Sequence, residues 1–257
     1  MDSANLKVNR AKKHLKELEK FLSVNKPFRY CVETNFKTGQ RATFADRNED
    51  LANDAGIIIG DIVHNLRAAM DHVYWECTES YSRSDGERKS IQFPISASEE
   101  SLQKSVLPGL PKRVSAEFAQ ALESLNPHRG DTGNNLLYAI HDLDVSDKHK
   151  LLIPTGNFTQ ISRDNIKKEL PDFPNMSGGF GNCRRDVVWK IQPMTWTQRR
   201  KAKIPPSNII IKELNVEVTV VLNIEGVEFS NPVEQTVREL ILEVERVIDV
   251  LRSACKH

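Results

Sequence analysis

The chain has 257 residues, of which 39% are hydrophobic and 28% are charged, and its formal net charge is +1. This composition is typical of a folded globular protein and excludes wholesale disorder. A nearly neutral chain gives no general argument for binding to nucleic acid or to a membrane. The four cysteines are far apart and form no CxxC pair, so we expect neither a zinc ribbon nor a disulfide framework.

The N-terminal segment is charged, and it has no apolar core of the kind found in signal peptides. No stretch of the chain approaches the roughly 20 apolar residues of a membrane span. We therefore expect a reduced cytoplasmic protein without a membrane partner. The basic clusters at 184–185 and 199–203 are interpreted as solvated surface charge, with contact to an RNA backbone as the alternative.

The first half of the chain reads mainly as helices. Apolar spacing predicts a helix over 3–24 and a long helix over 51–80 that is broken or begins near Gly56 or Gly60. A hairpin of two strands at 28–34 and 39–46 lies between them, and a loop is predicted at 82–89. Further segments follow, with an extended piece at 91–95, helices near 97–105, 114–125 and 133–146, and a strand at 151–154.

The second half begins with weak patterning. Prolines and glycines over 157–182 predict a long irregular loop. β-patterning follows, and the segment 232–255 then has one broad apolar face, which predicts a long helix that packs on the β-rich region or on the N-terminal helix. The predicted strands are 187–192, 208–214, 216–224 and 227–229, with a tight turn at Glu225-Gly226.

The expected fold class is therefore α+β. A helical layer carries a polar motif helix, and a mostly antiparallel sheet from the C-terminal third is joined by a long C-terminal helix. We expect residues 1–257 to form a single domain, since its first and last helices both need partners. A division into a mainly helical lobe, 1–156, and a β-rich lobe with the C-terminal helix, 183–257, is the alternative.

The segment GDIVHNLRAAMDHVYW, residues 60–75, carries the most informative pattern. At about 100° per residue, its polar residues fall on one side of a helix and its apolar residues on the other. This polar stripe consists of Asp61, His64, Asn65, Asp71 and His72 and holds no Lys or Glu. Lys and Glu favour helices more than Asp, Asn or His do, so something other than helix stability selects these residues.

A second polar segment, HDLDVSDKHK, covers residues 141–150. Asp147 falls close to the apolar side of its helix and Asp144 less closely, and carboxylates near a buried face usually have a partner. His64, His72 or Arg67 could supply that partner, so we expect the stripe to meet residues 141–149. His149 can lie beyond the helix end.

The pattern G-D-x-x-H-N-L-R-x-A-x-D-H, with L-x-x-L-x-x-x-D-K-H-K downstream, resembles a family of uncharacterised bacterial proteins. That resemblance implies a helical N-terminal half, an element at Phe93-Pro94 and a more divergent β-rich C-terminal part. It implies no activity.

The spacing of Arg67 and His72 also resembles HEPN domains, helical modules that include metal-independent endoribonucleases with an R-x4–6-H signature. The resemblance implies that His72 acts as general base or acid and that Arg67 stabilises charge on the phosphate. The residue after the arginine is commonly polar in such nucleases and is Ala68 here. The two side chains also point roughly 140° apart on one helix, so a site would need a bent helix or a second subunit.

Three functions compete. The first is RNA cleavage by a HEPN-like homodimer in a host-defence or toxin system, without a cofactor. The second is a non-catalytic interaction protein with an unknown protein partner, in which the stripe is a buried polar seam. The third, a metal site, is the least favoured, because His64 and His72 lie roughly 12 Å apart along the helix axis. The candidate catalytic residues are Arg67, His72, His64 and Asp71, and the supporting residues are Asp61, Asn65, Asp144, Asp147 and His149.

Overall fold

The structure is a computed structural model, and it describes residues 2–152, 154–158, 161–174, 187–224, 227–229 and 231–255. The chain divides into two compact units. The helical unit comprises Met1–Ser23, Asn53–Ile153 and Leu222–His257, and the sheet unit comprises Val24–Ala52 and Pro154–Val221. Helices and antiparallel strands are both present, which confirms the α+β class. Strands β1 and β2, from the N-terminal half, share the sheet unit with β4 and β5, so the units do not follow the predicted lobes.

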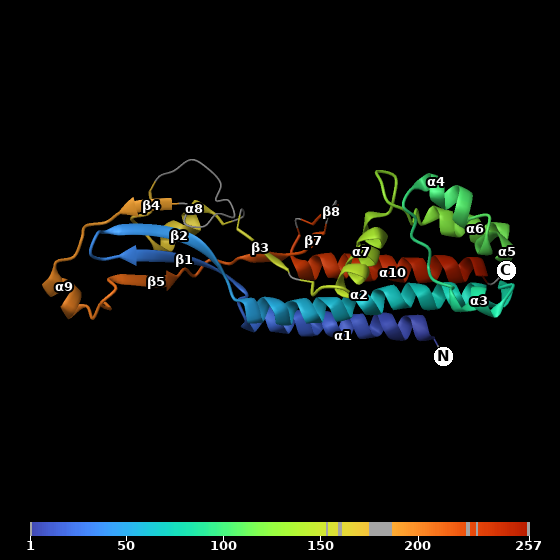
Figure 1. The fold of residues 1–257 in the computed structure, drawn as a ribbon, viewed down its shortest axis with the longest axis horizontal. Helices are drawn as coiled ribbons and strands as arrows, with labels where there is room; N and C mark the ends of the chain where they lie inside the picture. The colour runs from blue at the N-terminus through green and yellow to red at the C-terminus, as the bar shows by residue number, and fades with distance from the viewer. Residues whose placement is uncertain are drawn as a thin grey trace. The chain divides into compact units, whose positions relative to one another are not determined.

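Three long helices form the core of the helical unit: α1 (Ser3–Val24), α2 (Glu49–Thr78) and α10 (Val233–Cys255) (Figure 1). The apolar face predicted for α10 is buried along its whole length. Ion pairs join it to α1, including Lys12 with Glu245 at 2.6 Å. At the other side Cys77 of α2 contacts the carbonyl of Leu251 at 3.8 Å. The predicted partners of this face were the β-rich region or the N-terminal helix, and the ion pairs show that α1 lies beside α10.

The rest of the helical unit consists of shorter helices and two short strands. They are η1 (Glu79–Tyr81), α3 (Asp85–Lys89), α4 (Glu99–Ser101), η2 (Leu102–Val106), α5 (Leu110–Val114), α6 (Ala116–Ser124), α7 (Asn135–Asp147), β7 (Asn223–Ile224) and β8 (Val227–Glu228). α7 begins where the Asn134 side chain accepts the N–H groups of Leu136 and Leu137, as expected for an N-cap asparagine. The loop predicted at 82–89 was wrong in part, because Ser84 caps the short helix α3.

The sheet unit contains a four-stranded antiparallel sheet in the order β4-β2-β1-β5 (Figure 1). Its strands are β1 (Phe28–Asn35), β2 (Gln40–Arg47), β4 (Val187–Lys190) and β5 (Ile209–Glu213), and α9 (Trp196–Lys201) joins β4 to β5. The predicted hairpin of β1 and β2 is confirmed and forms the centre of the sheet. Gly39 has φ +73° in its turn, and a Cβ there would meet the carbonyl oxygen of Ile191 at 2.2 Å, so glycine is required.

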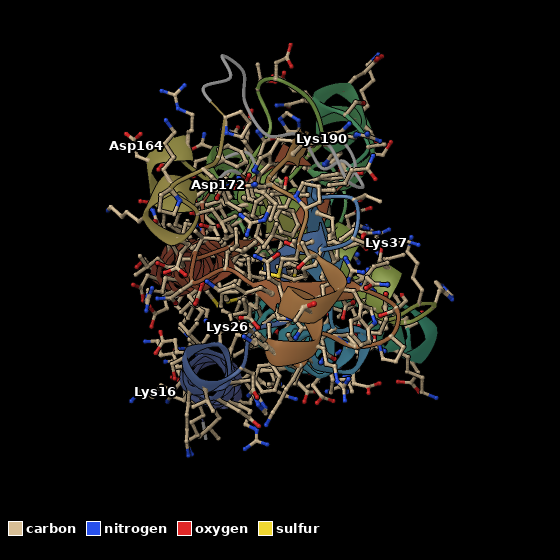
Figure 2. The ribbon with its side chains drawn as sticks, turned by 90° about the vertical axis from the view of Figure 1, so that its left-hand side faces the viewer. Lys16, Lys26, Lys37, Asp164, Asp172 and Lys190 are labelled. Atoms are coloured by element: carbon tan, nitrogen blue, oxygen red, sulfur yellow. The ribbon has the colours of Figure 1, made fainter. Side chains whose placement is uncertain are left out.

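Two predictions about the middle of the chain were wrong. Residues 151, 152 and 154 are not a strand, and the strand β3 (Thr155–Asn157) begins after them and pairs with β6 (Thr219–Val221). The predicted irregular loop contains helix α8 (Arg163–Glu169), which Ser162 caps by accepting the N–H of Asn165. Asp172, which is labelled in Figure 2, follows α8. It accepts hydrogen bonds from Arg41 of β2 and Trp189 of β4. The turn predicted at Glu225-Gly226 lies outside the described residues.

Candidate functional site

The motif lies in the middle of α2, which runs without a break through Gly56 and Gly60. The interruption predicted there was therefore wrong. The apolar side of the motif is fully buried, with Ile59, Ile62, Leu66, Ala69, Met70 and Val73 each 0% exposed. The polar stripe opposite them is not uniform: Asp61 and His64 are exposed, whereas Asn65, Asp71 and His72 are half-buried.

Arg67 is the most buried charged residue of the motif, at 7% exposure. Its Nη2 donates a 2.8 Å hydrogen bond to the carbonyl oxygen of Phe93 and lies 3.0 Å from Oδ1 of Asp71. Oδ1 of Asp71 in turn accepts the N–H of Phe93 at 2.9 Å. We name this group of three residues the arginine clamp. Phe93 lies outside any helix or strand, so no secondary structure bonds its N–H and C=O groups. The arginine clamp supplies both hydrogen bonds, and buried backbone groups need such partners.

The arginine clamp holds Phe93 in the core. The ring of Phe93 is 1% exposed and packs edge-on against Tyr74 of α2, with 6.1 Å between the ring centroids. The Nη1 atom of Arg67 is buried and has no hydrogen-bond partner among the described residues.

His64 makes the predicted contact with the second polar segment. Its Nδ1 lies 3.2 Å from Oδ1 of Asp144 on α7, and Oδ2 of Asp144 accepts from Lys148 at 2.6 Å. Asp144 is 3% exposed, whereas the His64 and Lys148 side chains are 60% and 59% exposed. Asp144, expected to be the less buried of the two aspartates, is the more buried one, because it continues the buried row of Leu137 and Ile140 on α7.

Asp147 contacts α2 one turn before His64. A Cβ at Gly60 would meet its carboxylate oxygens at 2.6 and 2.7 Å, and a Cβ at Gly56 would meet the carbonyl oxygen of Leu152 at 2.0 Å. The two glycines thus let the end of α7 and the segment after it approach the backbone of α2. Burial, together with the negative charges of Asp144 and Asp61, raises the pKa of Asp147.

The other residues of the predicted set do not join one centre. Asn65 donates to the carbonyl oxygen of Asp61 within its own helix at 2.7 Å. His149 is exposed and lies after the end of α7. The Nδ1 atom of His72 is buried without a hydrogen-bond partner in the described parts of the chain. Burial and the nearby charge of Arg67 lower the pKa of His141, which favours its neutral form.

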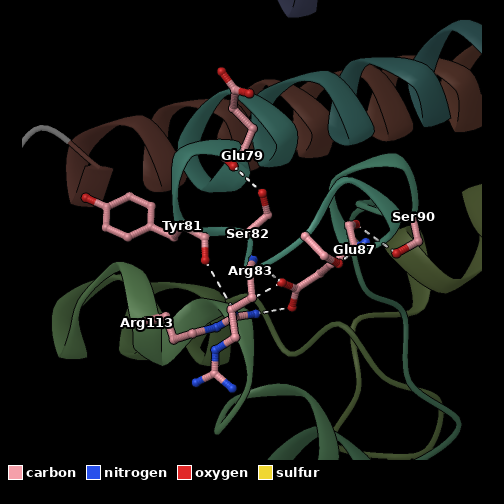
Figure 3. Close-up of polar contacts among 8 residues, drawn as sticks. Glu79, Tyr81, Ser82, Arg83, Glu87, Ser90 and Arg113 are labelled. Atoms are coloured by element: carbon pink, nitrogen blue, oxygen red, sulfur yellow. Dashed lines mark hydrogen bonds and ion pairs between the residues drawn. The ribbon is translucent and has the colours of Figure 1, made fainter.

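Sequence reasoning missed a polar cluster at the C-terminal end of α2 (Figure 3). Glu87 of α3 pairs with Arg113 of α5 and accepts the N–H of Arg83 at 2.5 Å. Arg113 also donates to the carbonyl oxygen of Tyr81 at 3.1 Å. The Arg113 guanidinium lowers the pKa of Glu87 to about 2. Since Glu87 and Arg113 are 26 residues apart in sequence and form no motif, only their charge could have suggested a pairing.

Within the described ranges, no group of three or more His, Cys, Asp or Glu side chains is placed to hold a metal ion. None of the described helices combines the length and apolar character needed to cross a membrane. Comparisons of the chain with family models, with curated proteins and with solved structures found no match.

Proposed function

We propose that this protein is a non-catalytic interaction protein. In this proposal the side chains of the polar motif of α2 hold other segments of the same chain in place. The observation that carries the proposal is the arginine clamp. Arg67 is buried, and its Nη2 is shared by the carbonyl of Phe93 and the carboxylate of Asp71. An arginine that stabilises a phosphate must reach it directly, whereas the Nη2 of Arg67 contacts the Phe93 carbonyl and the Asp71 carboxylate of its own chain.

The second aspartate and the second polar segment support the same interpretation. Asp71 accepts the N–H of Phe93, and the buried Asp144 has the His64 imidazole and the Lys148 ammonium as its partners. Buried carboxylates need such partners whether or not a reaction takes place. The net charge of +1 also offers no general attraction for RNA.

Surfaces for a partner exist in the sheet unit. Ile209, Ile210 and Ile211 of β5 are 37%, 37% and 58% exposed, and Trp196 of α9 is 66% exposed. Exposed apolar groups of this kind often mark sites of protein association. Because three of these exposed residues are consecutive on one strand, we propose the sheet unit as the site of interaction.

An RNA-cleavage assay in the presence of EDTA tests the proposal. Wild-type protein should leave a mixed-sequence single-stranded RNA as intact as buffer alone does. The proposal is overturned if the RNA is cleaved and if His64→Ala or His72→Ala abolishes that cleavage. His149→Ala is the matched control, because this exposed histidine lies outside both helices, and it should change nothing in either case.

A metal-independent endoribonuclease is the second candidate, and the geometry of His64 favours it. The Nδ1 of this solvent-exposed imidazole is held by a buried carboxylate, and its Nε2, which bonds no other described residue, could take a proton from a 2′-hydroxyl. In this proposal His64 is the general base and Asp144 is its positioning residue. The HEPN resemblance instead assigns the base to His72 with Arg67, so the two histidine variants distinguish the two versions.

A further inference from the structure

The outer side of β5 is an unpaired edge of the sheet. Figure 1 shows β5 at the margin of the sheet beside β1, and no strand in the described parts of the chain pairs with its other side. All five residues of β5 are exposed. An exposed edge strand rich in β-branched residues is a template for pairing with another strand.

The hydrogen bonds to β1 identify which backbone groups face outward. The N–H of Phe36 donates to the carbonyl of Asn208, and the N–H of Leu214 donates to the carbonyl of Tyr30, both at 2.8 Å. Bonded positions alternate in an antiparallel pair, so even-numbered residues of β5 bond β1. The N–H and C=O groups of Ile209, Ile211 and Glu213 therefore point away from the sheet.

We propose that a second copy of this chain pairs with this edge, β5 against β5 in antiparallel order, about a two-fold axis at Ile211. The outward residues Ile209, Ile211 and Glu213 are spaced symmetrically about Ile211, so this register pairs all of them. The inference rests on the proposed function, because it names the partner of an interaction protein.

Charge and side-chain type favour this register over its neighbours. With Ile211 facing Ile211 of the partner subunit, Lys212 faces an isoleucine and Glu213 faces an isoleucine, so no like charges oppose each other. A shift by two residues in one direction places Lys212 opposite its own copy. A shift in the other direction leaves the outward groups of Glu213 without their isoleucine partner.

The side-chain contacts of β5 leave this edge accessible. Glu213 is held by Lys26 at 3.6 Å and by Arg29 at 3.7 Å, both from its own sheet unit, and Lys212 by Glu169 at 3.4 Å. Among the described residues, the N–H of Ile209 has one contact, a long one of 3.4 Å with the Ser207 hydroxyl. Five paired residues bury little surface compared with stable dimers, so we expect association that depends on protein concentration.

Sedimentation velocity over a wide range of protein concentration, with full-length protein, tests the proposal. Wild type should pass from monomer to dimer. Ile211→Arg should abolish the dimer by placing two cations on the axis, whereas Leu242→Arg, at an exposed leucine on α10 (64% exposed), is the matched control and should dimerise as wild type does. Circular dichroism spectra verify that both variants are folded.

Ile210→Glu tests the register itself. Only pairing about Ile211 places residue 210 opposite Lys212 of the partner subunit, and two new opposite-charge pairs should tighten the dimer roughly two- to thirty-fold. In the register that pairs residue 210 with its own copy, the same change brings two glutamates together and weakens the dimer. Ile210→Lys should do the reverse of Ile210→Glu.

A monomer at all concentrations overturns the proposal, and so does a dimer that Ile211→Arg leaves unchanged. Weakening by Ile210→Glu overturns the register. These outcomes are independent of the RNA assay. If the protein is a monomer and does not cleave RNA, the second copy is ruled out as the partner, but the proposed interaction function stands. If the protein is a dimer and cleaves RNA in a way that depends on His64, the interaction function is overturned, but the β5 pairing stands.

Discussion

The guanidinium of Arg67 and the carbonyl oxygen of Phe93 are joined by a 2.8 Å hydrogen bond across 26 residues of sequence. Asp71, one turn after Arg67, accepts the N–H of the same phenylalanine. The motif helix therefore provides both a donor and an acceptor to one backbone position, as a neighbouring β-strand would. The motif fixes residues 91–95, which lie outside any helix or strand between α3 and α4, to the helical core.

Arg67→Ala should destabilise the helical unit by about 3 kcal/mol, because it leaves the Phe93 carbonyl and the Asp71 carboxylate without their partner in a buried setting. Urea unfolding followed by circular dichroism measures the change. Arg10→Ala, at an exposed arginine of α1, is the control and should shift the free energy of unfolding by less than about 0.5 kcal/mol. Equal losses for both variants would contradict the clamp.

Replacing the glycines of α2 by alanine should reverse the usual helix preference. Alanine is favoured over glycine by about 1 kcal/mol in a helix interior, yet at Gly56 its Cβ would overlap the backbone carbonyl of Leu152. Gly56→Ala should therefore lower the melting temperature markedly. Gly60→Ala should lower it less, because the Asp147 carboxylate that it meets is the end of a side chain and can move.

Gly86→Ala is the internal control for this series. A Cβ at Gly86 would meet only the Ser84 hydroxyl at 3.8 Å, so this variant should be neutral or slightly stabilising. A Gly56→Ala variant as stable as Gly86→Ala would show that the segment after α7 does not lie against α2.

The sequence was sufficient to predict α1, α2, α10 and the β1–β2 hairpin, because each has a regular apolar pattern and a clear end. It also predicted that the polar stripe meets the segment around Asp144. It could not predict the arginine clamp, because Arg67 bonds a backbone carbonyl. Every residue has such a carbonyl, so the sequence does not show which one is the partner. For the same reason Gly56 and Gly60 suggested a break in α2, whereas they provide room for a neighbouring chain segment.

Asp147→Asn should stabilise the protein at neutral pH. The pKa of Asp147 is raised in the folded state, chiefly by burial, so the folded protein holds its proton more tightly than the unfolded chain does. Ionisation above the folded pKa therefore costs stability. The gain from asparagine should be present at pH 7 and vanish below the ordinary pKa of aspartate, about 3.8.

Free energies of unfolding at pH 7 and pH 3 measure this difference. Asp54→Asn, at an exposed position of the same helix α2, is the control and should have little effect at either pH. A destabilised Asp147→Asn variant at pH 7 would mean that the carboxylate makes a favourable interaction that outweighs its burial.

Glu87 should show the opposite dependence on pH. Its pKa is lowered from 4.5 to about 2, first by the hydrogen bond from Arg113 and then by the N–H of Arg83. The unfolded chain therefore binds the proton more tightly, and the stabilisation by Glu87 is complete above pH 4.5 and is lost as the pH falls toward 2. Glu87→Gln should lower the melting temperature at pH 7 and match wild type near pH 2.

Glu100→Gln is the control. It breaks an ion pair with Lys104 whose two side chains are 73% and 74% exposed, and it should have little effect at any pH, because water already screens that pair. If the Glu87→Gln and wild-type curves ran parallel down to pH 2, the Glu87–Arg113 pair would not form in solution.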